Sequence, residues 1–210
     1  MRPKLSDLTN NQVDEQTSAQ YHQAMMCTRL AGHAIIRVVG RCKDAQENEN
    51  LDLSECQLMQ VPDAVFHLMR HTTLKTCDLS FNVITKIPPI LAAKFSCITE
   101  LNVSNNRMSK LPEEIGELQQ LVSLNISHNA FVSVPRVTYT LPKLEQINAE
   151  KNYISDVDAK RLAERSCLKV ANFRQNPLNK ETHDELSKVA RITILLSPIE
   201  DEDWDKQNDY

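Results

Sequence analysis

Residues 121–131, LVSLNISHNAF, contain the pattern that decides the fold. An apolar residue stands at the first, fourth and sixth places, asparagine at the ninth and phenylalanine at the eleventh. The same spacing recurs in copies that start at Leu74, Ile98, Leu144 and Leu168, and a weaker copy has Leu51, Leu53, Cys56 and Leu58 at the fourth, sixth, ninth and eleventh places. A pattern that returns at a fixed period of this length is typical of a solenoid, in which similar units stack and bury a shared core.

The ninth place of each copy forms a column that we call the ladder. Its members are Cys56, Asn82, Asn106, Asn129, Asn152 and Asn176, spaced 26, 24, 23, 23 and 24 residues apart. An asparagine side chain has donors and an acceptor, so it can bond the backbone groups that lose their partners where a strand ends. We therefore expect the ladder to link neighbouring turns, with Cys56 as a structural substitute.

Three longer runs resemble the short intracellular leucine-rich-repeat proteins: LDLSECQLMQVP at 51–62, LPEEIGELQQLVSLNISHN at 111–129, and NFRQNPLNK at 172–180. The resemblance implies an α/β solenoid, or horseshoe, with a parallel concave sheet of about six repeats. A proline lies six residues past the ladder in four repeats, at Pro62, Pro88, Pro112 and Pro135. Because proline suits the start of a helix, we expect one or two helical turns on the convex side.

The chain divides into five predicted segments. Residues 1–20 form a disordered extension, 21–47 a capping helix, 48–180 the repeats, 181–198 a cap made of a helix and an edge strand, and 199–210 an acidic disordered tail. Apolar residues at three- and four-residue steps, Ile35, Val38 and Cys42 among them, predict that the first helix covers the open end of the core. The alternative is a basic amphipathic helix for a membrane surface or a partner.

The acidic tail concentrates the charge of the chain. The net charge is −4, and residues 200–210 hold six acids and one base, so they carry −5 and leave the rest at +1. Trp204 lies among these acids. One interpretation is a solvated segment, and the other is a linear motif that Trp204 anchors in a basic groove.

Composition excludes several classes of function. The chain lacks the basic balance of a nucleic-acid binder and has no apolar run long enough to span a membrane. Six cysteines without a CxxC pair indicate buried thiols rather than a metal or redox site. No histidine lies in a motif for a nucleophile, metal or phosphate loop, so we expect no enzyme, no cofactor and no small-molecule substrate. The polar N-terminus predicts a cytoplasmic protein, with the nucleus left open.

The residues between the apolar places predict where a partner binds. We expect the concave face to expose an Asp/Asn column, a serine-rich column (Ser54, Ser80, Ser104, Ser127) and a third column with Phe81 and His128. The candidate contact residues are Asp78, Phe81, Asn102, Asn105, Asn125, His128, Asn148, Lys151, Asn172 and Arg174. The alternative is that these polar columns are only the solvated face of the sheet.

These observations favour a non-catalytic interaction module, an adaptor or scaffold for an unidentified protein. Six strands about 4.8 Å apart give a sheet of under about 400 Å², half a standard interface, so a partner must also touch a rim or a cap. The alternative function is a regulatory or chaperone-like binder that uses the acidic tail on a basic partner. We expect a monomer, although an exposed last strand at 191–197 would allow edge-to-edge dimers.

Overall fold

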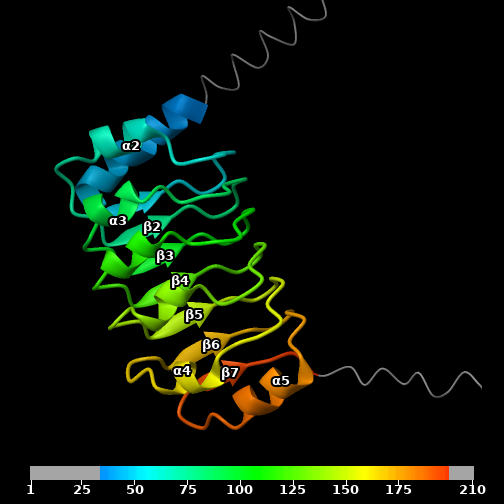
Figure 1. Ribbon diagram of the computed structural model, residues 1–210. Coiled ribbons are helices and arrows are strands. Elements are labelled where there is room, and N and C mark those ends of the chain that lie inside the picture. Colours follow the sequence, from blue (N-terminus) through cyan, green and yellow to red (C-terminus); the bar gives the residue numbers. More distant parts are fainter. Residues whose placement is uncertain (1–33, 199–210) are drawn as a thin grey trace, which may run out of the picture.

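The computed structural model describes residues 34–198, and its centre is one sheet of seven strands (Figure 1). The strands are β1 (Asn50–Asp52), β2 (Thr76–Asp78), β3 (Glu100–Asn102), β4 (Ser123–Asn125), β5 (Gln146–Asn148), β6 (Val170–Asn172) and β7 (Thr193–Leu195). Every pair is parallel and the spatial order follows the chain. The predicted solenoid is thus confirmed, with six repeat strands and a seventh from the C-terminal cap.

The core lies directly behind the sheet. The middle residue of each repeat strand points inward and is at most 2% exposed; these residues are Leu51, Cys77, Leu101, Leu124, Ile147 and Ala171. Small Ala149 and Ala171 are fully buried beside Phe173, which is also fully buried. Large and small side chains therefore share the volume in the last repeats, as volume-conserving packing requires.

Short helical segments return the chain behind the strands. They are α2 (Asp63–Leu68), α3 (Ile90–Lys94), the 3-10 turns η1 (Glu113–Glu117) and η2 (Arg136–Tyr139), α4 (Ala159–Ala163) and α5 (Lys180–Ser187). Proline precedes the first four, at Pro62, Pro89, Pro112 and Pro135. Its fixed φ suits this place, and its missing amide would have no partner there. Since these segments need more lateral room than strands about 4.8 Å apart, the sheet lies on the inner, concave side.

The ladder asparagines connect each turn to the repeat before it. Asn129 is 7% exposed, accepts a hydrogen bond from the Met108 amide (2.9 Å) and donates to the carbonyl of Val103 (2.9 Å). It also donates to two carbonyls of its own repeat, those of Ile126 and Ser127. Asn82, Asn106, Asn152 and Asn176 repeat this arrangement. Four bonds to buried backbone groups explain why the place needs an amide side chain.

The N-terminal cap is a helix described over residues 34–48. It buries Val38, Cys42 and Ala45, which are one face of the helix. Arg41 Nη1 donates to the carbonyls of Asp52 (3.1 Å) and Ser54 (2.6 Å), and Arg37 Nη1 to that of Glu55 (3.0 Å).

These arginine contacts give the first turn the donors that a preceding repeat would supply. They support the capping interpretation, because Arg37 and Arg41 bind the first repeat and are thereby occupied, whereas a basic helix for a membrane or partner would need them free. One expectation is wrong: Ile35 is 64% exposed, because in the described part of the helix the buried face consists of Val38, Cys42 and Ala45. Residues 21–33 of the predicted helix lie outside the described part.

At the other end, α5 and β7 close the core with Leu186 and Ile192, both buried. The helix begins at an N-cap, where the Asn179 side chain accepts from the Thr182 amide (2.7 Å). The predicted tail, 199–210, and the predicted extension, 1–20, fall outside the described residues. Within residues 34–198, no helix is both long enough and apolar enough to cross a membrane.

Candidate functional site

The exposed face of the sheet carries two columns of strand residues. The first and third residues of each strand point away from the core, and in the repeat strands they are exposed or half-buried. The third-residue column is the predicted Asp/Asn column. The first-residue column was missed; it holds Asn50, Thr76, Glu100, Ser123, Gln146 and Val170. The strict alternation of side chains along a strand predicts this column and was the signal that could have found it.

The Asp/Asn column has a structural task of its own. In each repeat its side-chain oxygen accepts from the backbone amide two residues later, for example Asp78 Oδ1 from Ser80 (2.8 Å) and Asn125 Oδ1 from Ser127 (3.1 Å). Asn102, Asn148 and Asn172 make the same bond. Such Asx turns satisfy an amide where the strand ends. Five of the ten predicted contact residues therefore have only their remaining polar atoms available to a partner.

Three serines of the serine-rich column are buried rather than exposed on the concave face, whereas Ser54 is half-buried. Ser80, Ser104 and Ser127 are each 4% exposed, and the preceding residues Leu79, Val103 and Ile126 are buried as well. Two consecutive buried residues break the alternation, because each strand has already ended at the Asp/Asn residue and the chain has begun to turn. The prediction that these serines face a partner is wrong, and their small size is what the crowded turn accommodates.

The third column forms the rim just after the strands, and its backbone is left-handed. Phe81, Asn105, His128 and Lys151 have φ of 54°, 53°, 54° and 53°, and Glu55 and Gln175 continue the row. Only glycine, asparagine and aspartate adopt this region readily, so Phe81 is an unusual occupant. Phe81 is also 57% exposed. His128 brings a buried Nδ1 that has no hydrogen-bond partner among the described residues.

Charge changes along the concave face. Asp52 and Asp78 lie at its N-terminal end, and Lys151, Lys169 and Arg174 at its C-terminal end. Asp52 is partly neutralised by Arg41 (3.1 Å), and Lys169 by Glu145 (2.7 Å). Within residues 34–198, Lys151 and Arg174 make no ion pair, so they carry the free positive charge of the face. The structure thus brings the predicted cations Lys151 and Arg174 to one end of the face and Phe81 to the other.

The environment of Asp52 shifts its acidity. Partial desolvation acts to raise the pKa of Asp52, but the hydrogen bonds from Ser54 and the charge of Arg41 outweigh it and hold the pKa below its ordinary value. Asp52 therefore stays ionised, and the first repeat keeps its contact with the capping helix.

The cysteine thiols differ in how deeply they are buried. Cys42, Cys56 and Cys77 are buried and free, and Cys97 and Cys167 are exposed and free. Burial, with a smaller contribution from Asp78, raises the pKa of Cys77 to about 12, so this thiol is inert at neutral pH. Over residues 34–198, no cluster of histidine, cysteine and carboxylate side chains is suited to hold a metal ion.

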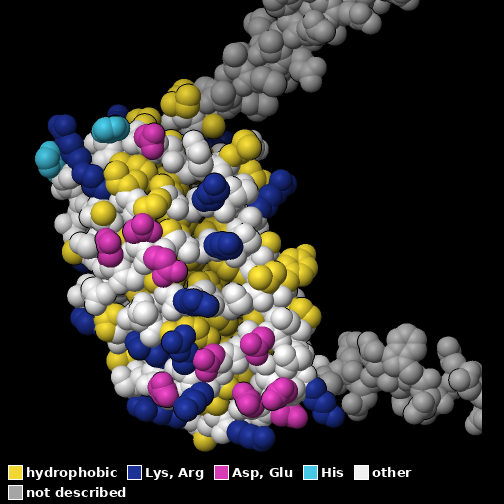
Figure 2. All heavy atoms as spheres, viewed as in Figure 1, with side chains coloured by type: hydrophobic (Ala, Val, Ile, Leu, Met, Phe, Trp, Pro, Cys, Tyr) yellow, Lys and Arg dark blue, Asp and Glu magenta, His cyan; other side chains and the backbone are white. Residues whose placement is uncertain are grey.

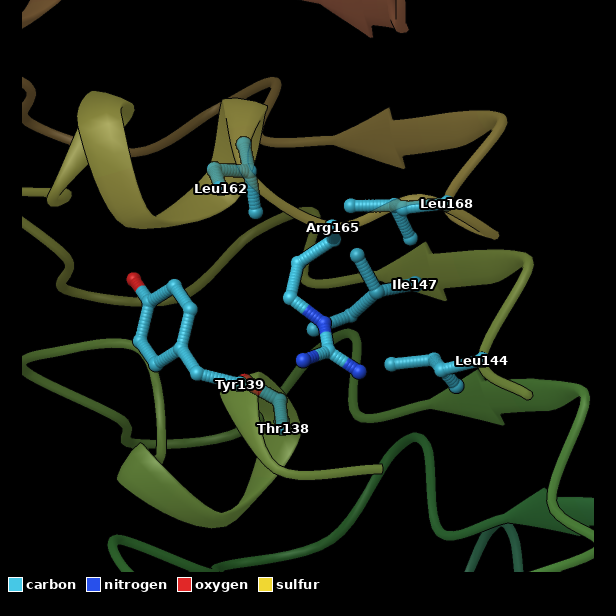
Figure 3. Close-up of a pocket in the computed structure, with 7 residues that line it drawn as sticks. All are labelled: Thr138, Tyr139, Leu144, Ile147, Leu162, Arg165 and Leu168. Carbon is cyan, nitrogen blue, oxygen red and sulfur yellow. The ribbon is translucent and has the colours of Figure 1, made fainter. Parts of the chain in front are cut away.

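One small cavity lies behind the sheet, between η2 and α4 (Figure 3). Leu144, Ile147 and Leu168 line it, and the Arg165 side chain crosses it to donate to the carbonyl of Leu141 (2.5 Å). Its volume of about 10 Å³ is close to that of one water molecule. It is a packing defect rather than a ligand site, and Ala149 and Ala171 do not line it.

Comparison with known proteins agrees with this geometry. The chain is 32% identical over 174 residues to mouse leucine-rich repeat-containing protein 20, covering 81% of this chain and 95% of that protein. The human protein of the same name is 33% identical over 171 residues, covering 80% and 93%. The chain belongs to the leucine-rich-repeat family. The sequence model described as leucine rich repeat matches residues 98–154.

Solved structures of the family share the fold. A leucine-rich-repeat protein of Leptospira interrogans has a TM-score of 0.58 at 24% identity, over 66% of this chain and 34% of that one. An internalin of Listeria monocytogenes has a TM-score of 0.58 at 22% identity, over 71% and 43%. Leucine-rich-repeat proteins generally mediate protein–protein interactions.

Proposed function

We propose that this protein is a non-catalytic adaptor or scaffold that binds a partner protein through the concave face and the left-handed rim. The observation that carries the proposal is Phe81. This side chain is 57% exposed and sits at φ 54°. A bulky residue is strained there by about 1 kcal/mol or more, and exposure of its ring offers no compensating packing. An aromatic anchor for a partner explains both features.

The charge pattern supports a directional partner. Phe81 lies near the acidic N-terminal end of the face, while Lys151 and Arg174 lie three and four repeats further on. A partner with an apolar contact for Phe81 and carboxylates toward Lys151 and Arg174 would fit one orientation only. Seven strands about 4.8 Å apart still give a sheet well below the roughly 800 Å² of a standard interface, so the rim or a cap must contribute.

Two further features support a non-catalytic role and a cytoplasmic location. His128 has a ring nitrogen with no partner within residues 34–198, so no carboxylate there orients it for acid–base catalysis. The free thiols of Cys97 and Cys167 are exposed, which suits a reducing compartment such as the cytoplasm.

The test separates binding from stability. Phe81→Asn replaces the aromatic ring with a residue that favours a left-handed backbone, so the thermal midpoint should stay level or rise. Gln175→Asn is the matched control, because Gln175 has φ 55° in the same column at the far end. Proteins captured from a lysate and identified by mass spectrometry should be lost with Phe81→Asn and kept with Gln175→Asn. Unchanged capture by both variants would contradict the proposal.

A further inference from the structure

A second surface lies on the flank of the solenoid, just past the ladder turns. Ile87, Leu111 and Val134 form its floor, with Pro89, Pro112 and Pro135 beside them; the part over Ile87 exposes mainly apolar surface, and the part over Val134 exposes polar and apolar surface together. It consists of two adjacent hollows along repeats two to four, which share the lining residues Ser109, Lys110 and Leu111. We call this surface the flank groove. It contains none of the concave-face residues.

The rim of the flank groove is basic. Lys86, Arg107, Lys110 and Arg136 line it and are exposed, against one lining carboxylate, Glu113. Within residues 34–198 none of these four cations forms an ion pair or a side-chain hydrogen bond. Figure 2 shows Lys and Arg side chains at intervals along the drawn face, next to hydrophobic side chains, with Asp and Glu side chains gathered toward the C-terminal end. The groove therefore suits a ligand that is acidic and carries an aromatic or aliphatic anchor.

The chain itself contains such a segment. Residues 199–210, IEDEDWDKQNDY, carry −5 and hold Trp204, which is the single tryptophan of the chain. We infer that this segment, the acidic tail, docks in the flank groove of its own chain, with Trp204 on the apolar floor between Leu111 and Val134 and the acids against the basic rim. The partner expected for the acidic tail is thus a surface of the same molecule.

The place where the tail leaves the solenoid permits this docking. The Ser197 hydroxyl accepts from the Gln175 amide (2.7 Å), so the described chain ends beside the turns that follow the strands, at the right edge of Figure 1. The groove begins just past the same row of turns. Val134 and Leu111 belong to repeats three and four strand steps from β7, which is at least about 14 and 19 Å because the flank lies outside the closely spaced strands. Pro198 and Trp204 are six residue steps apart, and an extended chain spans about 20 Å over them, so Val134 is the nearer of the two to the reach of Trp204.

Repeat five interrupts the basic rim with Asp156 and Asp158, and the tail must pass them. Both acids already have partners: Asp156 Oδ1 accepts from the Thr182 hydroxyl (2.8 Å), and Asp158 lies 3.7 Å from Arg161. Arg161 therefore reduces the repulsion from Asp158, whereas Asp156 keeps its charge and the four cations beyond it lack partners within the described residues. An intramolecular segment also acts at an effective concentration in the millimolar range, so a weak contact suffices for docking.

Trp204 makes the docking directly measurable, because all tryptophan fluorescence of the protein comes from this residue. We expect the full chain at low salt to emit at shorter wavelength, and to be quenched less by acrylamide, than a free peptide of residues 199–210. The blue shift should disappear at about 0.5 M salt, where the screening length falls to a few ångströms.

Charge reversal tests the location. Lys110→Glu with Arg136→Glu should remove the blue shift, and the control Lys43→Glu with Arg70→Glu, an equal charge change at exposed residues outside the groove, should keep it. Changing Glu200, Asp201, Glu202 and Asp203 to lysine in the Lys110→Glu/Arg136→Glu protein should restore the shift. These reversals sit on the surface, so circular dichroism should be unchanged.

Three results would overturn the inference. The first is a full chain whose emission equals that of the free peptide at low salt. The second is a blue shift that the groove variants and the control variants affect equally. The third is a blue shift that grows with protein concentration, which would place the tail on a second copy or an assembly. Because Phe81 takes no part, these outcomes are independent of the proposed concave-face function.

Discussion

Asn125 and Asn129 lie four residues apart in one repeat and have the same side chain, but they perform different tasks. Asn129 is 7% exposed and makes four hydrogen bonds, two of them to the preceding repeat. Asn125 is half-buried at the end of β4, and its oxygen accepts one bond from its own repeat. The comparison teaches that burial and the number of backbone groups served, rather than residue type, decide which asparagines hold the solenoid together.

The largest expected effect comes from the ladder. Asn129→Ala leaves the buried Met108 amide without a partner, while the Val103 carbonyl keeps the bond from Asn106 Nδ2 (3.1 Å). We expect a loss of about 2–3 kcal/mol in the free energy of unfolding, since an orphaned buried group costs about 1–3 kcal/mol and three further hydrogen bonds are lost. Urea denaturation measures it. A loss below that of Asn125→Ala would break the comparison.

Cys56 tests whether the ladder place always prefers asparagine. No repeat precedes it, and Arg41 and Arg37 already donate to the carbonyls of Asp52, Ser54 and Glu55. Cys56 is 1% exposed, so an asparagine oxygen there would be buried with no amide to accept from. We expect Cys56→Asn to destabilise the protein by about 1–2 kcal/mol by urea denaturation, although it restores the repeat pattern. Greater stability in this variant would show that the cap does not replace a repeat.

The Asp/Asn column should give a smaller loss. Asn125→Ala removes one Asx-turn bond to the Ser127 amide at a half-buried place. We expect a loss of about 0.5–1.5 kcal/mol, the net value of one such hydrogen bond. Asn125→Asp keeps the acceptor and is the control, which should retain most of the stability.

The smallest effect is expected at Asp52, the residue of the Asp/Asn column that pairs with Arg41 of the capping helix. Asp52→Asn keeps the acceptor for the Ser54 amide and removes the charge next to Arg41. Because its pKa is lowered in the folded state, Asp52 contributes stability above its unfolded pKa, and that contribution is lost as the pH falls through the folded pKa. With the pair largely exposed, we expect a loss below about 0.5 kcal/mol at pH 7.

At a pH low enough to protonate Asp52 in the folded state, the wild type and Asp52→Asn should unfold at the same denaturant concentration. A difference of equal size at both pH values would mean that the charge of Asp52 plays no part in holding the capping helix.

The repeat and its ladder could be predicted from the sequence because their residues face inward at fixed spacing. Apolar side chains at the first, fourth and sixth places can be buried in only one arrangement of stacked units. The C-terminal strand was also predictable, since its apolar run follows a helix and ends at Pro198. Within the repeats, the prediction that failed concerns residues just past the end of a strand. Ser80 was expected outside because alternation was continued past Asp78, the last residue of β2.

The candidate site was less predictable because it depends on the turn. The sequence pattern predicts Asp78, Asn102 and Asn125 as free polar groups on the concave face. An Asp or Asn two residues before a turn amide is, however, the pattern of an Asx turn, in which the side-chain oxygen is already bonded. The left-handed backbone at Phe81 has no signal in its own residue type, since phenylalanine disfavours it. Asn105 in the same column was the one available sign. Ile35 was expected inside because the helical period does not show where the contact surface of a cap begins.

The ladder has a direction: each asparagine holds the turn of the repeat that was synthesised before it. The Met108 amide stays unbonded until Asn129 is made, and the Phe131 amide until Asn152 is made, in both cases 21 residues later. At roughly 5–20 residues per second, a nascent repeat spends about one to four seconds with its turn unbonded. On the ribosome the newest repeat is therefore always the least secure, and folding advances one repeat behind translation until the final helix and strand close the chain.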